Sequence, residues 1–211
     1  EEEKVAKAAA VKLADEAGIK REAVGNTFRL MSDPVNNFSY HQNLHFGKLL
    51  EDLDYYWLEE PMYDEFHGSL KSLKEKLKIP IVGGETAENH PEGVAHLISD
   101  RAVDIIRGDI SWSGGITGLL KTAHLAEAHG MNCEIHTAIY HPLELVNLHC
   151  ALAIKNTEFF EVLIPEHLFN IGLKEKIQIK NGHAHVPKNK PGLGIELDWD
   201  FIDNSTLKIF D

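Results

Sequence analysis

The stretch IPIVGGETAENHPEGVAHLISDRAVDIIRGD (residues 79–109) contains two apolar runs, and each of them ends in a carboxylate, at Glu85 and at Asp109. Residues 92–99, between the two runs, carry apolar side chains at helical spacing. A strand, a helix and a second strand in this order form a βα unit with parallel strands and a right-handed crossover. The stretch therefore predicts a parallel β-sheet with helices packed against it.

The same pattern repeats along most of the chain. Six apolar runs end in a polar side chain at intervals of 24 to 27 residues, at Asp33, Glu59, Glu85, Asp109, His136 and Glu161. Helix-like stretches separate these runs, at residues 40–53, 70–77, 92–99, 118–129 and 143–154. An interval of this length is what one βα unit requires.

Two α/β architectures contain such units. A doubly wound sheet places its chemistry at one crevice, whereas a TIM-type barrel collects side chains from the ends of many strands on one face. Six successive polar strand ends favour the barrel. Because a closed barrel has eight units, we expect a TIM-like barrel that is truncated at its N-terminus by two units.

The two ends of the chain differ from this pattern. Residues 1–18 read as a helix already in progress that stops at Gly18, without an initiator Met or a signal peptide, so we expect the chain to begin inside a larger protein. From Leu168 onwards a hairpin is predicted around Asn181-Gly182, followed by further turn formers. We therefore expect a partial barrel over residues 1–167 and a β-rich tail over residues 168–211 that packs on a capping domain missing from this chain.

Composition narrows the class of partner. The formal net charge of −12 disfavours nucleic acid, because neutralising phosphates requires clustered lysines and arginines. No apolar run approaches the roughly 18 residues of a membrane span. The two cysteines, Cys133 and Cys150, lack the spacing of a zinc site or a redox pair, which favours a reducing compartment. We expect a cytoplasmic protein with a small-molecule partner.

Three carboxylates, Asp33, Glu59 and Glu85, end three consecutive predicted strands. At the mouth of a barrel their charges would repel one another unless a cation lies between them. Hard oxygen donors without Cys or His suit an octahedral Mg²⁺ ion that keeps positions for water and substrate. We predict these residues as metal ligands; the alternative is that each is a solvated loop residue.

Asp109 and His136 end the next two predicted strands. An Asp beside a His fixes the tautomer of the imidazole and raises its basicity, which makes a general base at neutral pH. Glu161 closes the series and is predicted to exchange a proton opposite that base. The alternatives are a structural histidine, in a chain that contains 13 of them, and a surface glutamate.

Several short strings in this order resemble the enolase superfamily, and the Asp–His pairing resembles its mandelate racemase-like subgroup. The strings are WLEEP (57–61), GGE (83–85), DISWSGGITG (109–118), EIHT (134–137) and FFE (159–161). The resemblance spans about Val5 to Asp211. It implies a (β/α)7β barrel, of which this chain carries about strands three to eight, capped by a separate α+β domain that mostly precedes residue 1.

The resemblance also implies roles for the six strand-end residues. It makes Asp33, Glu59 and Glu85 the ligands of Mg²⁺ on the third, fourth and fifth strands. It makes Asp109 and His136 the catalytic dyad, and Glu161 an acid that contacts the substrate. The second-strand Lys-x-Lys of the family, or its equivalent, would lie upstream of this chain, so the opposing base is not seen. Trp112 stands where the muconate-lactonizing branch carries a catalytic lysine, which argues against that branch.

The reaction implied is a Mg²⁺-dependent removal of the proton α to a carboxylate, followed by β-elimination of water. A sugar acid would thereby become a 2-keto-3-deoxy acid, and the protein would be a hydro-lyase. The alternatives are a racemase or epimerase of a 2-hydroxy acid, which the missing second strand would decide, and a non-catalytic relative with a binding role. We expect a homo-oligomer that acts on a small carboxylate.

Overall fold

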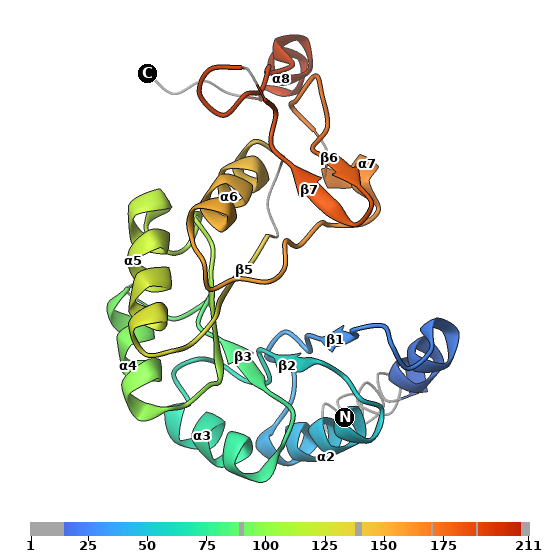
Figure 1. Ribbon diagram of the computed structural model, residues 1–211, viewed down its shortest axis with the longest axis vertical. Helices are drawn as coiled ribbons and strands as arrows, with labels where there is room; N and C mark the ends of the chain where they lie inside the picture. The colour runs from blue at the N-terminus through green and yellow to red at the C-terminus, as the bar shows by residue number, and fades with distance from the viewer. Residues whose placement is uncertain (1–14, 89–90, 138–140, 170, 189, 208–211) are drawn as a thin grey trace.

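A computed structural model of the chain describes residues 15–88, 91–137, 141–169, 171–188 and 190–207. Five short parallel strands form one sheet in sequence order: β1 (Met31–Ser32), β2 (Trp57–Glu59), β3 (Ile81–Gly83), β4 (Ile105–Gly108) and β5 (Cys133–Ile135). The register pairs Leu58 with Ile81 and Ile106 with Cys133. The sheet curls into a half-barrel whose concave side is open (Figure 1).

The helices lie on the outer, convex side of this sheet (Figure 1). They are α2 (Tyr40–Asp52), α3 (His67–Lys76), α4 (Glu92–Asp100), α5 (Gly115–Ala128) and α6 (His141–Ala153). All five were predicted from apolar spacing, with starts that differ by up to three residues. An apolar stripe marks the buried face of a helix but not its first turn, which accounts for these shifts.

The core lies between the strands and the helices. Leu58, Ile81 and Ile106 on the strands are completely buried, as are Leu50 on α2 and Leu97 on α4. Removing such a side chain from water stabilises the fold by about 1.5–3 kcal/mol. The half-barrel is therefore held by apolar packing on its convex side, which leaves the polar strand ends free for another role.

The sixth predicted strand is present only as a single parallel bridge between Ile135 and Phe160. The segment that contains it is attached to β5 through the buried carboxylate of Glu134. That carboxylate accepts hydrogen bonds from the hydroxyl of Thr157 at 2.9 Å and from the backbone N–H of Glu158 at 3.0 Å. The Glu134 side chain therefore supplies hydrogen bonds to this segment that the backbone would supply in a longer pair of strands.

The predicted stop of the first helix at Gly18 is wrong. Residues 15–24 are helical, and the helix ends before Gly25, which has a φ of 73°. The Arg21 guanidinium donates to the carbonyls of Gly25 at 2.6 Å and Leu53 at 2.7 Å, so it joins this helix to the end of α2. This tertiary contact stabilises the helix beyond Gly18, although a glycine is often the residue at which a helix ends.

The tail contains the predicted hairpin, formed by antiparallel β6 (Gln178–Lys180) and β7 (His183–His185). It also contains α8 (Trp199–Ser205), and α7 (Glu166–Phe169) spans its start; the turn formers predicted neither helix. The Asp198 side chain caps α8 by accepting from the N–H of Phe201 at 3.1 Å. The tail is therefore a mixture of helix and strand, not β structure alone.

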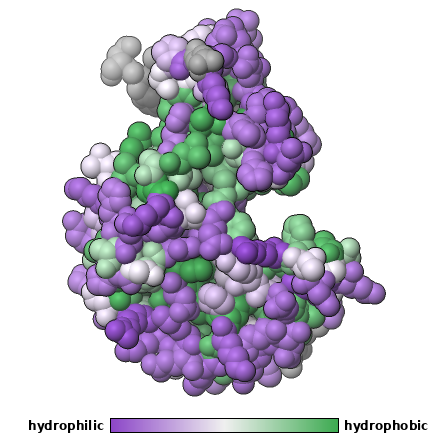
Figure 2. All heavy atoms as spheres, in the orientation of Figure 1, coloured by the Kyte–Doolittle hydropathy of each residue, from purple (hydrophilic) through white to green (hydrophobic). Residues whose placement is uncertain are grey.

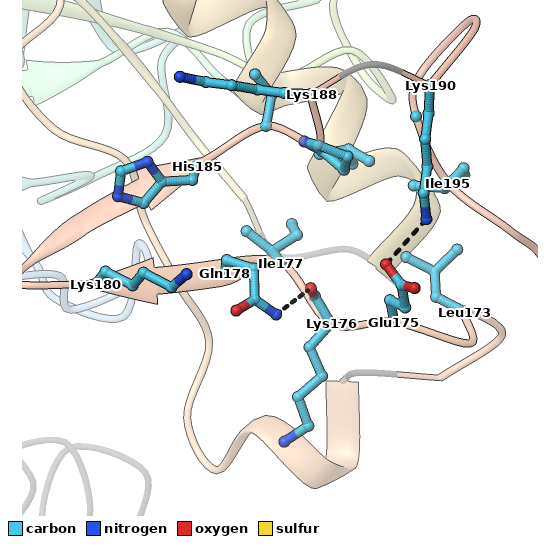
Figure 3. A pocket seen from close by; sticks show the side chains of 14 residues that line it. Leu173, Glu175, Lys176, Ile177, Gln178, Lys180, His185, Lys188, Lys190 and Ile195 are labelled. Carbon is cyan, nitrogen blue, oxygen red and sulfur yellow. Dashed lines mark hydrogen bonds and ion pairs between the residues drawn. The ribbon is translucent and has the colours of Figure 1, made fainter.

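A pocket of about 420 Å³ lies between α6 and the hairpin (Figure 3). Leu145 of α6 and Leu173 of the tail line it, together with lysines such as Lys188 and Lys190. Lys190 pairs with Glu175 at 3.0 Å. None of the six strand-end residues lines this pocket, so it is separate from the predicted site.

Figure 2 shows a deep indentation on the open side of the half-barrel, between the tail and the N-terminal part of the chain. In the part of the chain that the structure describes, no helix is long and apolar enough to cross a membrane.

Candidate active site

Parallel pairing places the carboxyl ends of all the strands at one edge of the sheet. Glu59 is the last residue of β2, and Asp33, Asp109 and His136 directly follow β1, β4 and β5. Glu85 lies two residues after β3. The prediction that these side chains share one edge is confirmed by the strand order and register.

Arg107 of β4 lies at the centre of the carboxylates. Its Nη2 atom is 2.5 Å from Oε1 of Glu59 and 3.0 Å from Oε2 of Glu161, and its Nε atom is 3.3 Å from Oε2 of Glu85. The Arg107 side chain is 5% exposed, and those of Glu59 and Glu85 are 7% and 5% exposed. Three carboxylates from three segments therefore share one buried guanidinium.

The electrostatic balance of this cluster favours a further cation. Burial raises the pKa of Glu85 to about 10, although the charge of Arg107 opposes the rise and neighbouring carboxylates add to it. Burial also raises the pKa of Glu59. A carboxyl group whose pKa is raised in this way is stabilised as an anion when a cation is placed beside it.

Asp33 lies at the rim of the cluster. Its Oδ1 atom accepts a hydrogen bond from the N–H of Val35 at 2.7 Å. Partial withdrawal from water raises the pKa of the Asp33 carboxyl, and the charges of Arg107 and His136 act against that rise. Asp33 is therefore within electrostatic range of the cluster, and no direct contact joins it to Glu59 or Glu85.

His136 lies between two carboxylates. Its Nδ1 atom is 3.1 Å from Oδ2 of Asp109, and its Nε2 atom is 3.4 Å from Oε1 of Glu85. Asp109 is completely buried, and its Oδ1 accepts from the N–H of Ser111 at 2.6 Å. The predicted Asp–His pair is thus formed, and its second imidazole nitrogen faces the carboxylate cluster.

Two further residues hold His136 in place. The indole of Trp112 stacks on the imidazole, with ring centroids 5.0 Å apart and planes inclined by 20°. Asn147 of α6 donates to the carbonyl of His136 at 3.0 Å and accepts from the N–H of Ile110 at 3.2 Å. Asn147 therefore connects the segments that carry the two members of the pair.

Glu161 is drawn into the site by Arg107 and by Thr137. Its Oε2 atom accepts from the N–H of Thr137 at 2.9 Å, and its side chain is 37% exposed. Glu161 and His136 therefore lie on neighbouring segments at the same end of the sheet.

A second pair of acidic residues, Glu60 and Asp64, follows Glu59 in the sequence. Burial, together with the nearby charge of Asp64, raises the pKa of Glu60 to about 7, and burial raises that of Asp64 to about 6. The Thr86 hydroxyl lies 3.1 Å from Oε1 of Glu60 and 2.9 Å from Oδ2 of Asp64. These acids support the loop after β3 and take no part in the strand-end series.

The three predicted ligands suit a Mg²⁺ ion, because Asp33, Glu59 and Glu85 offer only carboxylate oxygens, which this ion prefers. The guanidinium of Arg107 lies against two of these three groups. Within the described ranges, no three acidic, histidine or cysteine side chains are spaced to hold one ion together as they stand. The chemistry of these residues therefore fits the metal.

Sequence reasoning missed Arg107, Asn147 and Glu134. A signal for Arg107 was available, since it is the one basic residue within the run VDIIRGD that ends at Asp109. A buried arginine in a strand requires carboxylate partners. The sequence contained no such signal for Asn147, because the pattern of an amphipathic helix does not show which loops the helix contacts.

Comparison with known proteins identifies the family. Residues 9–201 match the family described as Enolase C-terminal domain-like. The chain is 34% identical over 175 residues to arabinonate dehydratase of Saccharolobus solfataricus, covering 82% of this chain and 46% of that protein. It is 27% identical over 191 residues to D-galactarolactone cycloisomerase of Agrobacterium fabrum, covering 86% of this chain and 50% of that protein.

Among solved structures, D-glucarate dehydratase from Agrobacterium tumefaciens complexed with magnesium matches with a TM-score of 0.84 at 37% identity. The match covers 92% of this chain and 51% of that one. The chain belongs to the enolase superfamily, in its mandelate racemase-like subgroup, and corresponds to the C-terminal portion. It spans about half the length of the curated relatives it matches.

Proposed function

We propose that this chain carries the metal-binding and proton-abstracting part of an acid-sugar dehydratase. The observation that carries the proposal is the pairing of His136 with Asp109, at 3.1 Å, beside the buried carboxylates at the strand ends. Relatives named arabinonate dehydratase and D-glucarate dehydratase support a sugar acid as the substrate. The product would be a 2-keto-3-deoxy acid.

In this proposal Asp33, Glu59 and Glu85 hold Mg²⁺. When bound, the ion supplies positive charge where negative charge develops on the substrate carboxylate as the α-proton leaves. The magnesium complex of D-glucarate dehydratase supports this choice of metal. Arg107 stays beside Glu161 and adds a second positive group at the same end of the sheet.

His136 acts as the base. Its Nε2 atom takes the proton from the α-carbon, and Asp109 at Nδ1 stabilises the imidazolium that results. The electron pair of the broken C–H bond forms a double bond to the β-carbon as the β-hydroxyl leaves. The imidazolium proton goes to that hydroxyl, which departs as water, and the enol becomes the 2-keto-3-deoxy acid. Glu161 contacts the substrate from the neighbouring segment.

The test is a panel of five- and six-carbon sugar acids incubated with the full-length protein and MgCl2, followed by detection of 2-keto acid as its semicarbazone. The His136→Asn variant serves as the inactive control. We expect keto acid from at least one member of the panel, and only with the unaltered protein. Bound magnesium without keto acid from any member would reject dehydration.

The alternative is a racemase or epimerase. The same base would remove the α-proton, and an acid on the opposite face of the substrate would return one. The relative named D-galactarolactone cycloisomerase supports an isomerisation, without net loss of water, as the alternative reaction. Exchange of the α-proton with solvent deuterium, without keto acid, would select this reaction. A protein that neither binds magnesium nor exchanges protons would be a non-catalytic relative.

We also propose that residues 1–167 belong to the barrel and that residues 168–211 associate with a capping domain in a homo-oligomeric enzyme. The tail leaves Trp199 59% and Phe201 40% exposed, which supports coverage by another part of the protein. Hydrogen exchange should show protection of α8 in the full-length protein, and light scattering should give a multiple of the subunit mass.

A further inference from the structure

Arg107 is the feature of this site that the proposed chemistry does not use fully. It lies on β4, where its neighbours in sequence are apolar, and only 4% of the residue is exposed. Its guanidinium contacts Glu59, Glu85 and Glu161, and Nη1 also donates to the carbonyl of Ile135 at 3.3 Å. Each of these contacts is to an oxygen atom, so the positively charged guanidinium is surrounded by acceptors.

Three carboxyl groups share the single guanidinium of Arg107. Glu59 and Glu85 are almost completely buried; Glu59 ends β2, and Glu85 lies in the loop after the adjacent strand β3. Two buried carboxylates this close repel each other unless positive charge is placed between them. Arg107 supplies that charge, because it is a permanent cation in the strand beside them.

Glu59 and Glu85 are also two of the carboxylates that would hold Mg²⁺ in the proposed site. The ion binds oxygens at about 2.0–2.1 Å in an octahedral arrangement, which leaves no room for a guanidinium among its ligands. Arg107 lies 2.5 Å from Oε1 of Glu59 and 3.3 Å from Oε2 of Glu85. With the guanidinium there, the two oxygens that it contacts cannot close around an ion.

We infer that Arg107 is an internal counterion that competes with the divalent cation for Glu59 and Glu85, and so sets the affinity of the site for metal. Metal entry requires Arg107 to release both carboxylates. It can do so and stay paired, because Glu161 at 3.0 Å and the carbonyl of Ile135 remain as partners. This inference rests on the proposed magnesium site.

The test is a calorimetric titration of MgCl2 into the full-length protein at pH 8, with unaltered protein and Arg107→Gln. Glutamine keeps polar atoms but removes the positive charge. We expect the variant to bind Mg²⁺ about tenfold more tightly or better, since the competing cation is gone. The control is Arg29→Gln, which removes one positive charge from an exposed pair with Glu158 and should leave the affinity unchanged.

The outcomes separate the two proposals. Binding by the unaltered protein with equal or weaker binding by Arg107→Gln would overturn the competition and leave the magnesium site standing. Binding by neither protein would overturn the competition and also remove the metal from the proposed function. An equal gain in Arg29→Gln would show a general charge effect, which also overturns the competition.

A second measurement covers an Arg107→Gln variant that fails to fold. The Nε–H group of Arg107 is buried and donates to Glu85, so its NMR resonance can be followed in protein labelled with ¹⁵N-arginine and assigned with Arg107→Lys. We expect saturating MgCl2 to shift this resonance, because the bond to Glu85 is lost. A resonance that stays in place at saturating metal would overturn the inference.

Discussion

The Nδ1 atom of His136 lies 3.1 Å from Oδ2 of Asp109, and Asp109 is completely buried. A buried carboxylate at this nitrogen favours the imidazole tautomer that carries its proton on Nδ1, so Nε2 is left to accept one. The stacked indole of Trp112 covers one face of the ring. The pair is therefore oriented by contacts from separate loops before any substrate is present.

We predict that His136→Asn lowers kcat of the full-length enzyme by about 10²- to 10⁴-fold, because it removes the base. Magnesium affinity should change far less, since the carboxylates remain. Turnover of the sugar acid and calorimetric titration with MgCl2 measure the two effects. Full activity in this variant would contradict the role assigned to the pair.

Glu59→Gln and Glu85→Gln should each weaken magnesium binding by about tenfold or more, because each removes an anionic oxygen donor. The matched control is Glu158→Gln, whose carboxylate is exposed and pairs with Arg29. Titration with MgCl2 under identical conditions compares the three variants. If both site variants bind as the control does, neither glutamate is a ligand.

Asp64→Asn should change how stability depends on pH. Burial raises the pKa of Asp64 from 3.8 to about 6, so between these values the folded state binds more protons than the unfolded state. Stability contributed by this group is therefore lost as pH rises from about 4 to 6 and stays lost above that range. The asparagine does not ionise, and its amide can donate to Thr86.

The variant should accordingly match the unaltered protein near pH 4 and exceed it at pH 8 by about 1–3 kcal/mol. Urea unfolding at a series of pH values measures this difference, with the exposed Asp203→Asn as the control. Parallel curves for Asp64→Asn and the unaltered protein would show that Asp64 does not carry the pH dependence.

Gly118→Ala should destabilise the protein by about 1–3 kcal/mol, because the new Cβ would lie 1.6 Å from the carbonyl oxygen of Ser113. The Ser113 hydroxyl accepts from the N–H of Asp109 at 3.0 Å, so turnover should fall as well. The control is Gly68→Ala on α3, where nothing lies within 4 Å and alanine should stabilise the helix. Thermal unfolding of both variants tests the contrast, and an unchanged Gly118→Ala protein would refute it.

Residues 1–211 expressed alone should be poorly soluble or partly molten and lack dehydratase activity. Within the described residues, the sheet ends at β1 on one side and at the single Ile135–Phe160 bridge beside β5 on the other. Unpaired strand edges favour aggregation. Size-exclusion chromatography and a thermal scan decide the matter, and a monomer with one sharp transition would prove the expectation wrong.

Much of the fold was predictable because its signals are local. Apolar spacing within residues 92–99 shows a helix whatever it packs against, and a polar residue at the end of an apolar run marks a strand end. Parallel strands then place Glu59, Asp109 and His136 at one edge by geometry alone. The extent of the last strand was not predictable, since it depends on how Glu134 binds the hydroxyl of Thr157 and the backbone N–H groups of Glu158 and Phe159.

The amino-acid sequence by itself determined which residues share the carboxyl edge of the sheet, because the period of a βα unit and parallel pairing leave no other arrangement. The curvature of the half-barrel decided which of them meet. It brings β2, the loop after β3 and the segment after β5 around one position of β4, so Glu59, Glu85 and Glu161 close on Arg107. Charges pair according to distance in space, and no local pattern contains that distance.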